Sequence, residues 1–137
     1  MTWRRSRLRG SMTAEFVILV PVVMTMVLFV THVGRVQTAS QAVRHVADMA
    51  ARSGSRAAGD RAVATAHHKA TLEMSRSDHD CERFAIGVSV ATKGEIQLLT
   101  TEVSCRVRTA GLSMLRLPAA LVKASSTETI DRYRGSR

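Results

Sequence analysis

A stretch of nineteen residues without Asp, Glu, Lys or Arg, from Phe16 to Gly34, limits what this chain can fold into. As an α-helix it would be about 28 Å long, close to the ~30 Å hydrocarbon thickness of a bilayer. The arginines that precede it are Arg4, Arg5, Arg7 and Arg9. Because the cytoplasmic flanks of membrane segments are enriched in Lys and Arg, we expect a single membrane-spanning helix with a cytoplasmic N-terminus. Everything after Arg35 would then lie outside the cytoplasm.

The basic charge of the chain is concentrated in that leader. The 137 residues carry a formal net charge of +9, which fits an acidic partner such as nucleic acid or anionic lipid. Without the four leader arginines the net charge falls to +5, and the remaining charge is spread thinly. Only 4% of the residues are aromatic, so the chain offers few stacking platforms and no specific nucleic-acid binding is expected.

A cleavable secretory signal also has a basic start followed by an apolar centre, and it is the main alternative for the first segment. The apolar region of such signals is usually shorter, and the small-x-small cleavage pattern is poorly matched by TASQA at residues 38–42. A permanent membrane helix is therefore the preferred interpretation.

One carboxylate, that of Glu15, stands at the start of the apolar run. A charged side chain at membrane depth is costly, so such a residue usually has a partner. If a peptidase cut after Gly10, the new α-amino group of Ser11 in a neighbouring copy could pair with this carboxylate, and the pair would be stronger in a low dielectric than in water. Glu15 would then hold subunits in register. The alternative places Glu15 at the headgroup level, where its charge costs little.

The run RGSMTAEFVILVPVV, residues 9–23, resembles the start of the TadE-like minor pseudopilins of tight-adherence (Tad/Flp) type IV pilus systems, and residues 30–54 are similar as well. The shared pattern is a basic leader ending in Gly, four residues, a Glu and an apolar helix that contains a Pro. The resemblance implies cleavage by a prepilin peptidase between Gly10 and Ser11, with Glu15 as the acid that recognition and assembly require.

Phe16 stands where major Flp pilins usually have Tyr, which favours a minor component. The resemblance further implies a structural protein without enzymatic activity, cofactor or resident metal. The expected partners are the prepilin peptidase, the major Flp pilin, other minor pseudopilins, the inner-membrane pilus platform and the lipid bilayer. The alternative function is a single-pass anchored binding domain whose leader is retained.

Pro21 lies inside the span, where it removes one backbone donor and favours a kink, which membrane helices tolerate. Beyond the span, apolar residues keep a helical period, so one helix is expected from about residue 12 to residue 52. SGS at 53–55 then interrupts it. Asp60 is the expected N-cap of a second, Ala-rich helix that ends near Met74.

From Glu82 onward the apolar period changes to two, which is typical of strands. A first strand, a loop at TKG 92–94 and a second strand at 96–107 would form a hairpin that pairs Val90 with Ile96 and Cys81 with Cys105. The apolar parity of the second strand switches at residues 98 and 99, which predicts a bulge there. A third strand is expected at 121–130, after a short helical turn or connection at 112–117.

These elements predict an α+β, pilin-like fold: a long N-terminal helix that starts in the membrane, a second packed helix and a small antiparallel three-stranded sheet. The expected divisions are a leader at 1–10, a membrane helix at 11–34 and an extracytoplasmic domain at 35–137. Outside the cytoplasm, two cysteines favour a disulfide between Cys81 and Cys105, with two independent thiols as the alternative.

Two short runs of histidines and aspartates are candidate metal ligands by residue type. They lack the spacing of known zinc or calcium frameworks, and neighbouring histidines point away from each other on a helix, so a solvated polar surface is the preferred interpretation. The residues concerned are His67, His68, Asp78, His79 and Asp80.

Overall fold

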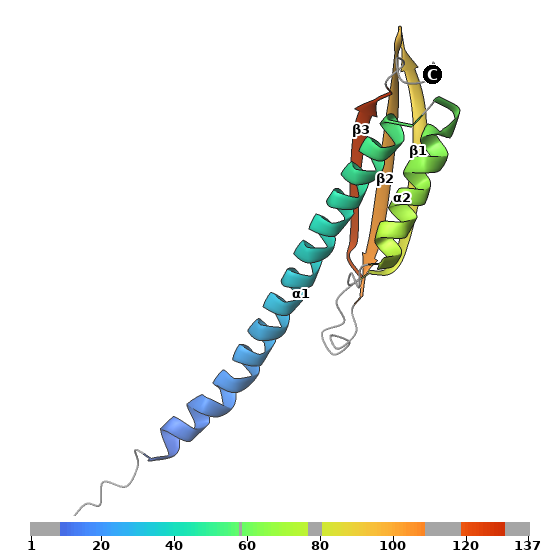
Figure 1. The fold of residues 1–137 in the computed structure, drawn as a ribbon. Helices are drawn as coiled ribbons and strands as arrows, with labels where there is room; N and C mark the ends of the chain where they lie inside the picture. The colour runs from blue at the N-terminus through green and yellow to red at the C-terminus, as the bar shows by residue number, and fades with distance from the viewer. Residues whose placement is uncertain (1–8, 58, 77–80, 109–118, 131–137) are drawn as a thin grey trace, which may run out of the picture. The chain divides into compact units, whose positions relative to one another are not determined.

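The computed structural model describes residues 9–57, 59–76, 81–108 and 119–130. Its elements along the chain are α1 (Arg9–Ser55), a short 3₁₀ helix (Gly59–Arg61), α2 (Ala62–Arg76), β1 (Cys81–Lys93), β2 (Ile96–Val107) and β3 (Leu121–Thr129). This confirms the expected α+β class (Figure 1). The chain divides into two compact units, 1–34 and 35–137, and the boundary falls inside α1.

The second unit is a three-stranded sheet in the order β1-β2-β3, antiparallel throughout, with helices on one face (Figure 1). The central strand β2 alternates between buried and less buried side chains over most of its length. Its helix-facing residues, all completely buried, are Leu99, Thr101, Val103, Cys105 and Val107. The alternation of side chains along a strand leaves the opposite face of the sheet without a helical cover in the described part of the chain.

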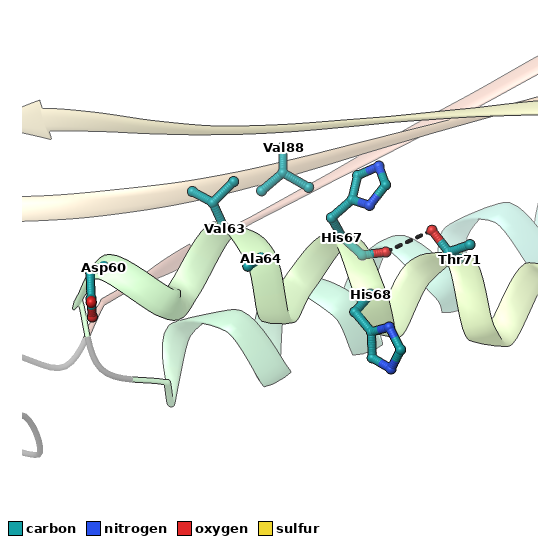
Figure 2. Close-up of a pocket in the computed structure, with 7 residues that line it drawn as sticks. All are labelled: Asp60, Val63, Ala64, His67, His68, Thr71 and Val88. Carbon is teal, nitrogen blue, oxygen red and sulfur yellow. Dashed lines mark hydrogen bonds between the residues drawn. The ribbon is translucent and has the colours of Figure 1, made fainter.

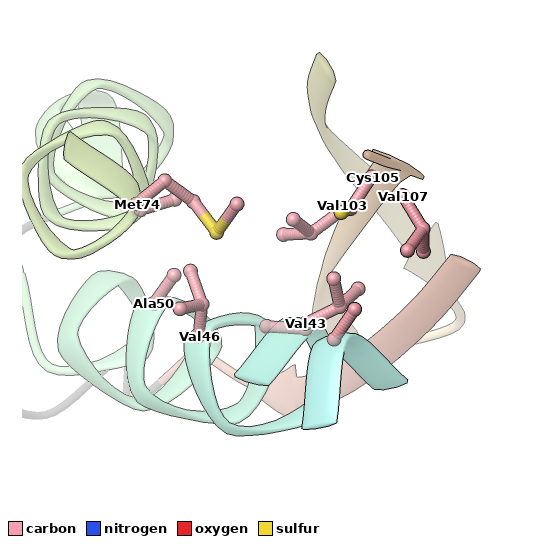
Figure 3. Close-up of a cluster of buried hydrophobic side chains, with 10 residues drawn as sticks. Val43, Val46, Ala50, Met74, Val103, Cys105 and Val107 are labelled. Atoms are coloured by element: carbon pink, nitrogen blue, oxygen red, sulfur yellow. The ribbon is translucent and has the colours of Figure 1, made fainter. Parts of the chain in front are cut away.

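Small residues let the helices approach the sheet closely. In the larger core cluster, small side chains of α1 and α2 pack together over β2 (Figure 3). Its buried members are Ala39, Val43, Val46, Ala47 and Ala50 on α1, Ala70 and Met74 on α2, and Val103, Cys105 and Val107 on β2. A second cluster joins Ala62, Ala66, Leu99 and Ile130. The Ala-rich face that the sequence predicts for the second helix is therefore the face that packs in the core.

Helix α1 runs through the SGS segment to Ser55, so the expected interruption at residue 53 is wrong. Gly54 lies inside the helix, where any Cβ would meet the Leu99 side chain and would come within 2.8 Å of the Ala62 carbonyl oxygen. Glycine is required there by close packing rather than by helix termination. Asp60 lies in the 3₁₀ helix and not at the N-cap position directly before α2, which begins at Ala62.

The β1–β2 hairpin has a tighter turn than expected. Lys93 pairs with Ile96, and Gly94 in the turn has φ = 62°, a left-handed conformation that glycine adopts freely. Val90 therefore faces Leu99 rather than Ile96. The expected three-residue loop and its register are wrong, because the chain reverses over two residues, 94 and 95.

The irregularity in this hairpin lies between Cys81 and Arg83, not at residues 98 and 99. No bulge is needed at Leu98, because the odd-numbered residues from Leu99 onward all face the helices while Leu98 lies on the other face of the sheet. The apparent parity switch in the sequence reflects one apolar residue on the uncovered face.

Cys81 and Cys105 form a disulfide, with a Cα–Cα distance of 5.5 Å. Cys81 pairs in register with Val107, and Cys105 pairs with Phe84, so the disulfide crosses the hairpin diagonally. Cys105 is fully buried in the core. The third strand forms as expected and ends at Thr129, whereas the expected turn at 112–117 lies outside the described residues.

Candidate membrane-anchoring and assembly segment

The first half of α1 exposes nearly all of its large apolar side chains. Phe16 is 66% exposed and Val17 is 72% exposed, and the apolar exposure continues to Val33. One helix of the described chain is long and apolar enough to cross a membrane, and none of its apolar window is buried by other parts of the chain. A helix that is apolar on all sides needs a cover of lipid or of other helices.

The threonine hydroxyls at positions 25 and 31 of this segment form hydrogen bonds within the helix. The Thr25 hydroxyl donates to the Pro21 carbonyl oxygen at 2.7 Å, and the Thr31 hydroxyl donates to the Val27 carbonyl oxygen at 2.8 Å. Such bonds to the preceding turn leave few free donors for an apolar environment. The helix continues through Pro21, and Thr25 bonds the proline's own carbonyl rather than that of Val17, which lacks a donor because of the proline.

Glu15 lies at the N-terminal edge of the exposed apolar surface. Its side chain is exposed and lines a shallow groove of about 540 Å³ with Phe16, Ile18, Leu19 and Val22. Residues three, four and seven positions apart share one face of a helix, so the carboxylate and three apolar side chains form one surface. Among the side chains that the structure describes, which begin at Glu15, no cation pairs with this carboxylate. This surface suits a second apolar helix that carries a positive charge at the same level.

The remaining predicted site residues are placed as follows. Gly10 and Ser11 belong to the first turns of α1, and Arg9 is its first residue. Arg4, Arg5 and Arg7 lie outside the described residues. The structure thus brings Glu15, Phe16 and Pro21 onto one continuous helix with the Gly10–Ser11 bond.

Sequence reasoning missed His32, a titratable side chain near the end of the apolar span. Its Nδ1 atom is buried and has no hydrogen-bond partner. A pattern defined by acidic, lysine and arginine side chains passes over histidine, although its ring nitrogens also need hydrogen-bond partners. Counting histidine as a polar residue would have found it.

A second hollow, of about 740 Å³, lies between α2 and β1 (Figure 2). It is lined by Asp60, Val63, Ala64, His67, His68, Thr71 and Val88. The two imidazole rings point in different directions from α2, and the Thr71 hydroxyl donates to the His67 carbonyl oxygen at 2.9 Å. In the described part of the chain, no three His, Cys, Asp or Glu side chains converge on a point that could hold a metal ion. Asp78, His79 and Asp80 lie outside that part.

Residues 10–52 match the family described as TadE-like protein. Over this segment the chain is TadE-like. The match covers the exposed apolar half of α1 and its continuation to Arg52, which confirms the resemblance drawn from the sequence. Neither the curated proteins nor the solved structures gave a match to the chain. The second helix and the sheet lie beyond the TadE-like segment.

Proposed function

We propose that this TadE-like chain is a minor pseudopilin that takes part in the assembly or function of a Tad/Flp type IV pilus. The observation that carries the proposal is the largely exposed apolar half of α1, which lies inside the TadE-like match. In this proposal, residues 1–10 form a cytoplasmic leader, residues 11–34 span the cytoplasmic membrane, and residues 35–137 form the extracytoplasmic domain. The four leader arginines support this orientation.

The chemistry of assembly follows from Glu15. Cleavage after Gly10 by a prepilin peptidase would create an α-ammonium group at Ser11, four residues before the carboxylate. In a bundle of such helices, the ammonium of one subunit would neutralise Glu15 of its neighbour, while Ile18, Leu19 and Val22 pack against the neighbour's apolar surface. An unpaired carboxylate in lipid is costly, so the pair would select bundles in which subunits are aligned at one level.

The proposed role is structural, without enzymatic activity or a cofactor. Its proposed partners are the prepilin peptidase, the major Flp pilin and other minor pseudopilins, together with the inner-membrane platform. Each of these partners would meet the chain through the segment that the TadE-like match covers.

The proposal is tested first by mass spectrometry of the chain purified from membranes of its own cells. A mature N-terminus at Ser11 is the expected result. A chain that keeps its arginine leader would instead support the anchored binding domain, and a chain that begins near Ala42 would show that the apolar helix is a cleaved secretory signal.

The role of Glu15 is tested separately with Glu15→Gln. We expect this variant to insert into the membrane but to lose co-purification with other pilins, because an amide cannot neutralise the Ser11 ammonium. Glu95→Gln, the same change in the exposed hairpin turn, is the matched control and should behave as wild type. Wild-type incorporation of Glu15→Gln would contradict the assembly mechanism.

A further inference from the structure

Three cations lie together on the uncovered face of the sheet. Arg83 on β1 and Arg106 on β2 are direct cross-strand partners, and Lys123 on β3 pairs in register with Ser104, two residues before Arg106. All three side chains are exposed. Like charges placed directly opposite each other destabilise a sheet, so this arrangement favours an external anion that neutralises them.

An exposed leucine completes this surface. Leu121 is the cross-strand partner of Arg106 on β3 and is 58% exposed. Hence one corner of the uncovered face combines cations with an apolar side chain. We refer to Arg83, Arg106, Lys123 and Leu121 as the basic corner.

The acids near the basic corner leave it positive. Glu82 precedes Arg83, and Glu102 lines a hollow of about 370 Å³ with Lys123. Neither forms an ion pair within the described residues. Arg108 adds a further exposed cation just after β2.

The opposite end of the same unit is balanced. There Arg52 on α1 contacts Asp48 at 3.2 Å and Glu128 on β3 at 3.7 Å. The other charged residues that the structure describes at that end are Arg56, Asp60, Arg61, Lys93 and Glu95, which include both signs. Among the residues that the structure describes, the excess of positive charge therefore lies at the end of the unit that carries the basic corner.

The basic corner lies at the end where the membrane segment joins the unit. Val36 and Ala39 at the start of this part of α1 pack in one cluster with Cys105, Val107 and Val122. The first two of these strand residues flank Arg106, and Val122 lies between Leu121 and Lys123. Chain connectivity thus tethers the basic corner near the point where the apolar span ends at Gly34.

We infer that the basic corner docks on the anionic phospholipid headgroups of the bilayer that the same chain spans. This inference rests on the membrane anchoring in the proposed function. Cations near an anionic lipid surface are attracted to it, and an apolar side chain beside them can enter the interfacial region. The exposed leucine favours lipid over a soluble phosphate, and the tether raises the effective concentration of the surface at the membrane.

The test uses the full chain in nanodiscs with a single tryptophan reporter, Leu121→Trp in a Trp3→Phe background, since Trp3 is the one native tryptophan. Quenching of its fluorescence by brominated lipid is compared between discs of phosphatidylcholine and discs that also contain phosphatidylglycerol. We expect stronger quenching in the anionic discs. Changing Arg83, Arg106 and Lys123 to Gln should abolish the difference, because each cation near the surface raises the docking constant roughly fivefold, equivalent to about 1 kcal/mol.

The matched control changes Arg56, Arg61 and Lys93 to Gln in the same reporter chain, which removes the same charge from the other end of the unit and should preserve the difference. Equal quenching in both disc types would overturn the inference while leaving the proposed function intact, because retention of the chain in the discs reports insertion separately. Failure of the chain to enter either disc would overturn both. Loss of quenching on adding inorganic phosphate at constant ionic strength would show that the basic corner is a phosphate site and would also overturn the inference.

Discussion

Gly54 of α1 lies directly against Leu99 of β2, with no room for a side chain between them. A Cβ at Gly54 would overlap the Leu99 side chain and would also lie 2.8 Å from both the Ala62 carbonyl oxygen and the Ala66 Cβ. The end of the long helix, the start of the second helix and the central strand therefore meet at one point. Such contact requires a hydrogen in place of a side chain.

Gly54→Ala should therefore destabilise the unit formed by residues 35–137, although alanine is the better helix former. Overpacking of a core typically costs about 1–3 kcal/mol, which exceeds the ~1 kcal/mol gain in helix propensity. Urea unfolding of the full chain in detergent measures the change. Gly59→Ala is the control, because a Cβ at Gly59 meets nothing within 4 Å. Equal stability of the two variants would contradict the packing at Gly54.

Thr101→Val should stabilise the unit. Thr101 is fully buried on the helix-facing side of β2, between Leu99 and Val103, and its hydroxyl has no hydrogen-bond partner. Replacing an unsatisfied buried hydroxyl by a methyl group of similar shape should raise the free energy of unfolding by about 1 kcal/mol. Thr100→Val is the control, since the Thr100 hydroxyl bonds that of Thr127 at 2.9 Å. A loss of stability in Thr101→Val would show that its hydroxyl has a partner.

Removing the Cys81–Cys105 disulfide should lower stability without changing the fold. The disulfide closes a loop with a sequence separation of 24 residues, and a cross-link over such a loop is worth roughly 3 kcal/mol through the entropy of the unfolded chain. The double variant Cys81→Ala/Cys105→Ala avoids placing a hydroxyl in the core at position 105. The urea midpoint of this variant should equal that of wild type whose disulfide has been reduced. A midpoint unchanged from oxidised wild type would contradict the prediction.

The sequence predicts the order and type of the elements because each rests on a local pattern. The charge-free run and its helical continuation indicate α1, and alternation around Val88 and Val103 indicates the strands. Glu15 also stands out from sequence alone, because a carboxylate beside an apolar run is unusual. Packing alone decides the rest. From sequence alone, Gly54 indicates a helix end, and only the structure shows that it packs against Leu99. The hairpin register depends on a two-residue turn at residues 94 and 95, which the sequence does not distinguish from a three-residue loop at 92–94.

The basic corner shows the same limit for surfaces. Arg83, Arg106 and Lys123 are far apart in sequence and look like scattered solvated charges. Only the register of β1, β2 and β3 brings them together. A one-residue error in either strand pairing would place these side chains on different faces, and the sequence-based register was in error by more than one residue.

Acidification should weaken α2 through Glu73. The Lys69 ammonium donates a hydrogen bond to Glu73 Oε1 at 2.7 Å, and this bond, together with the charges of Lys69, Arg76 and His45, lowers the pKa of the Glu73 carboxyl below its ordinary value of 4.5. A carboxyl whose pKa is lowered by folding stabilises the folded state above its unfolded pKa, and this contribution is lost as the pH falls through the folded pKa. The stability difference between wild type and Glu73→Gln should thus be constant above about pH 5 and shrink below pH 4.5.

Thermal unfolding of the full chain in detergent between pH 6 and pH 3 measures this difference. Lys69→Met is the matched variant, because it removes both the ammonium charge and the N–H donor and leaves the carboxylate. It should lose the same pH-dependent contribution, since the hydrogen bond to Lys69 is the largest cause of the lowered pKa. Added salt should reduce the effect, because the pair lies at the surface of α2 and is partly screened. A difference between wild type and Glu73→Gln that persists unchanged to pH 3 would mean that the carboxylate does not stabilise the helix through its charge.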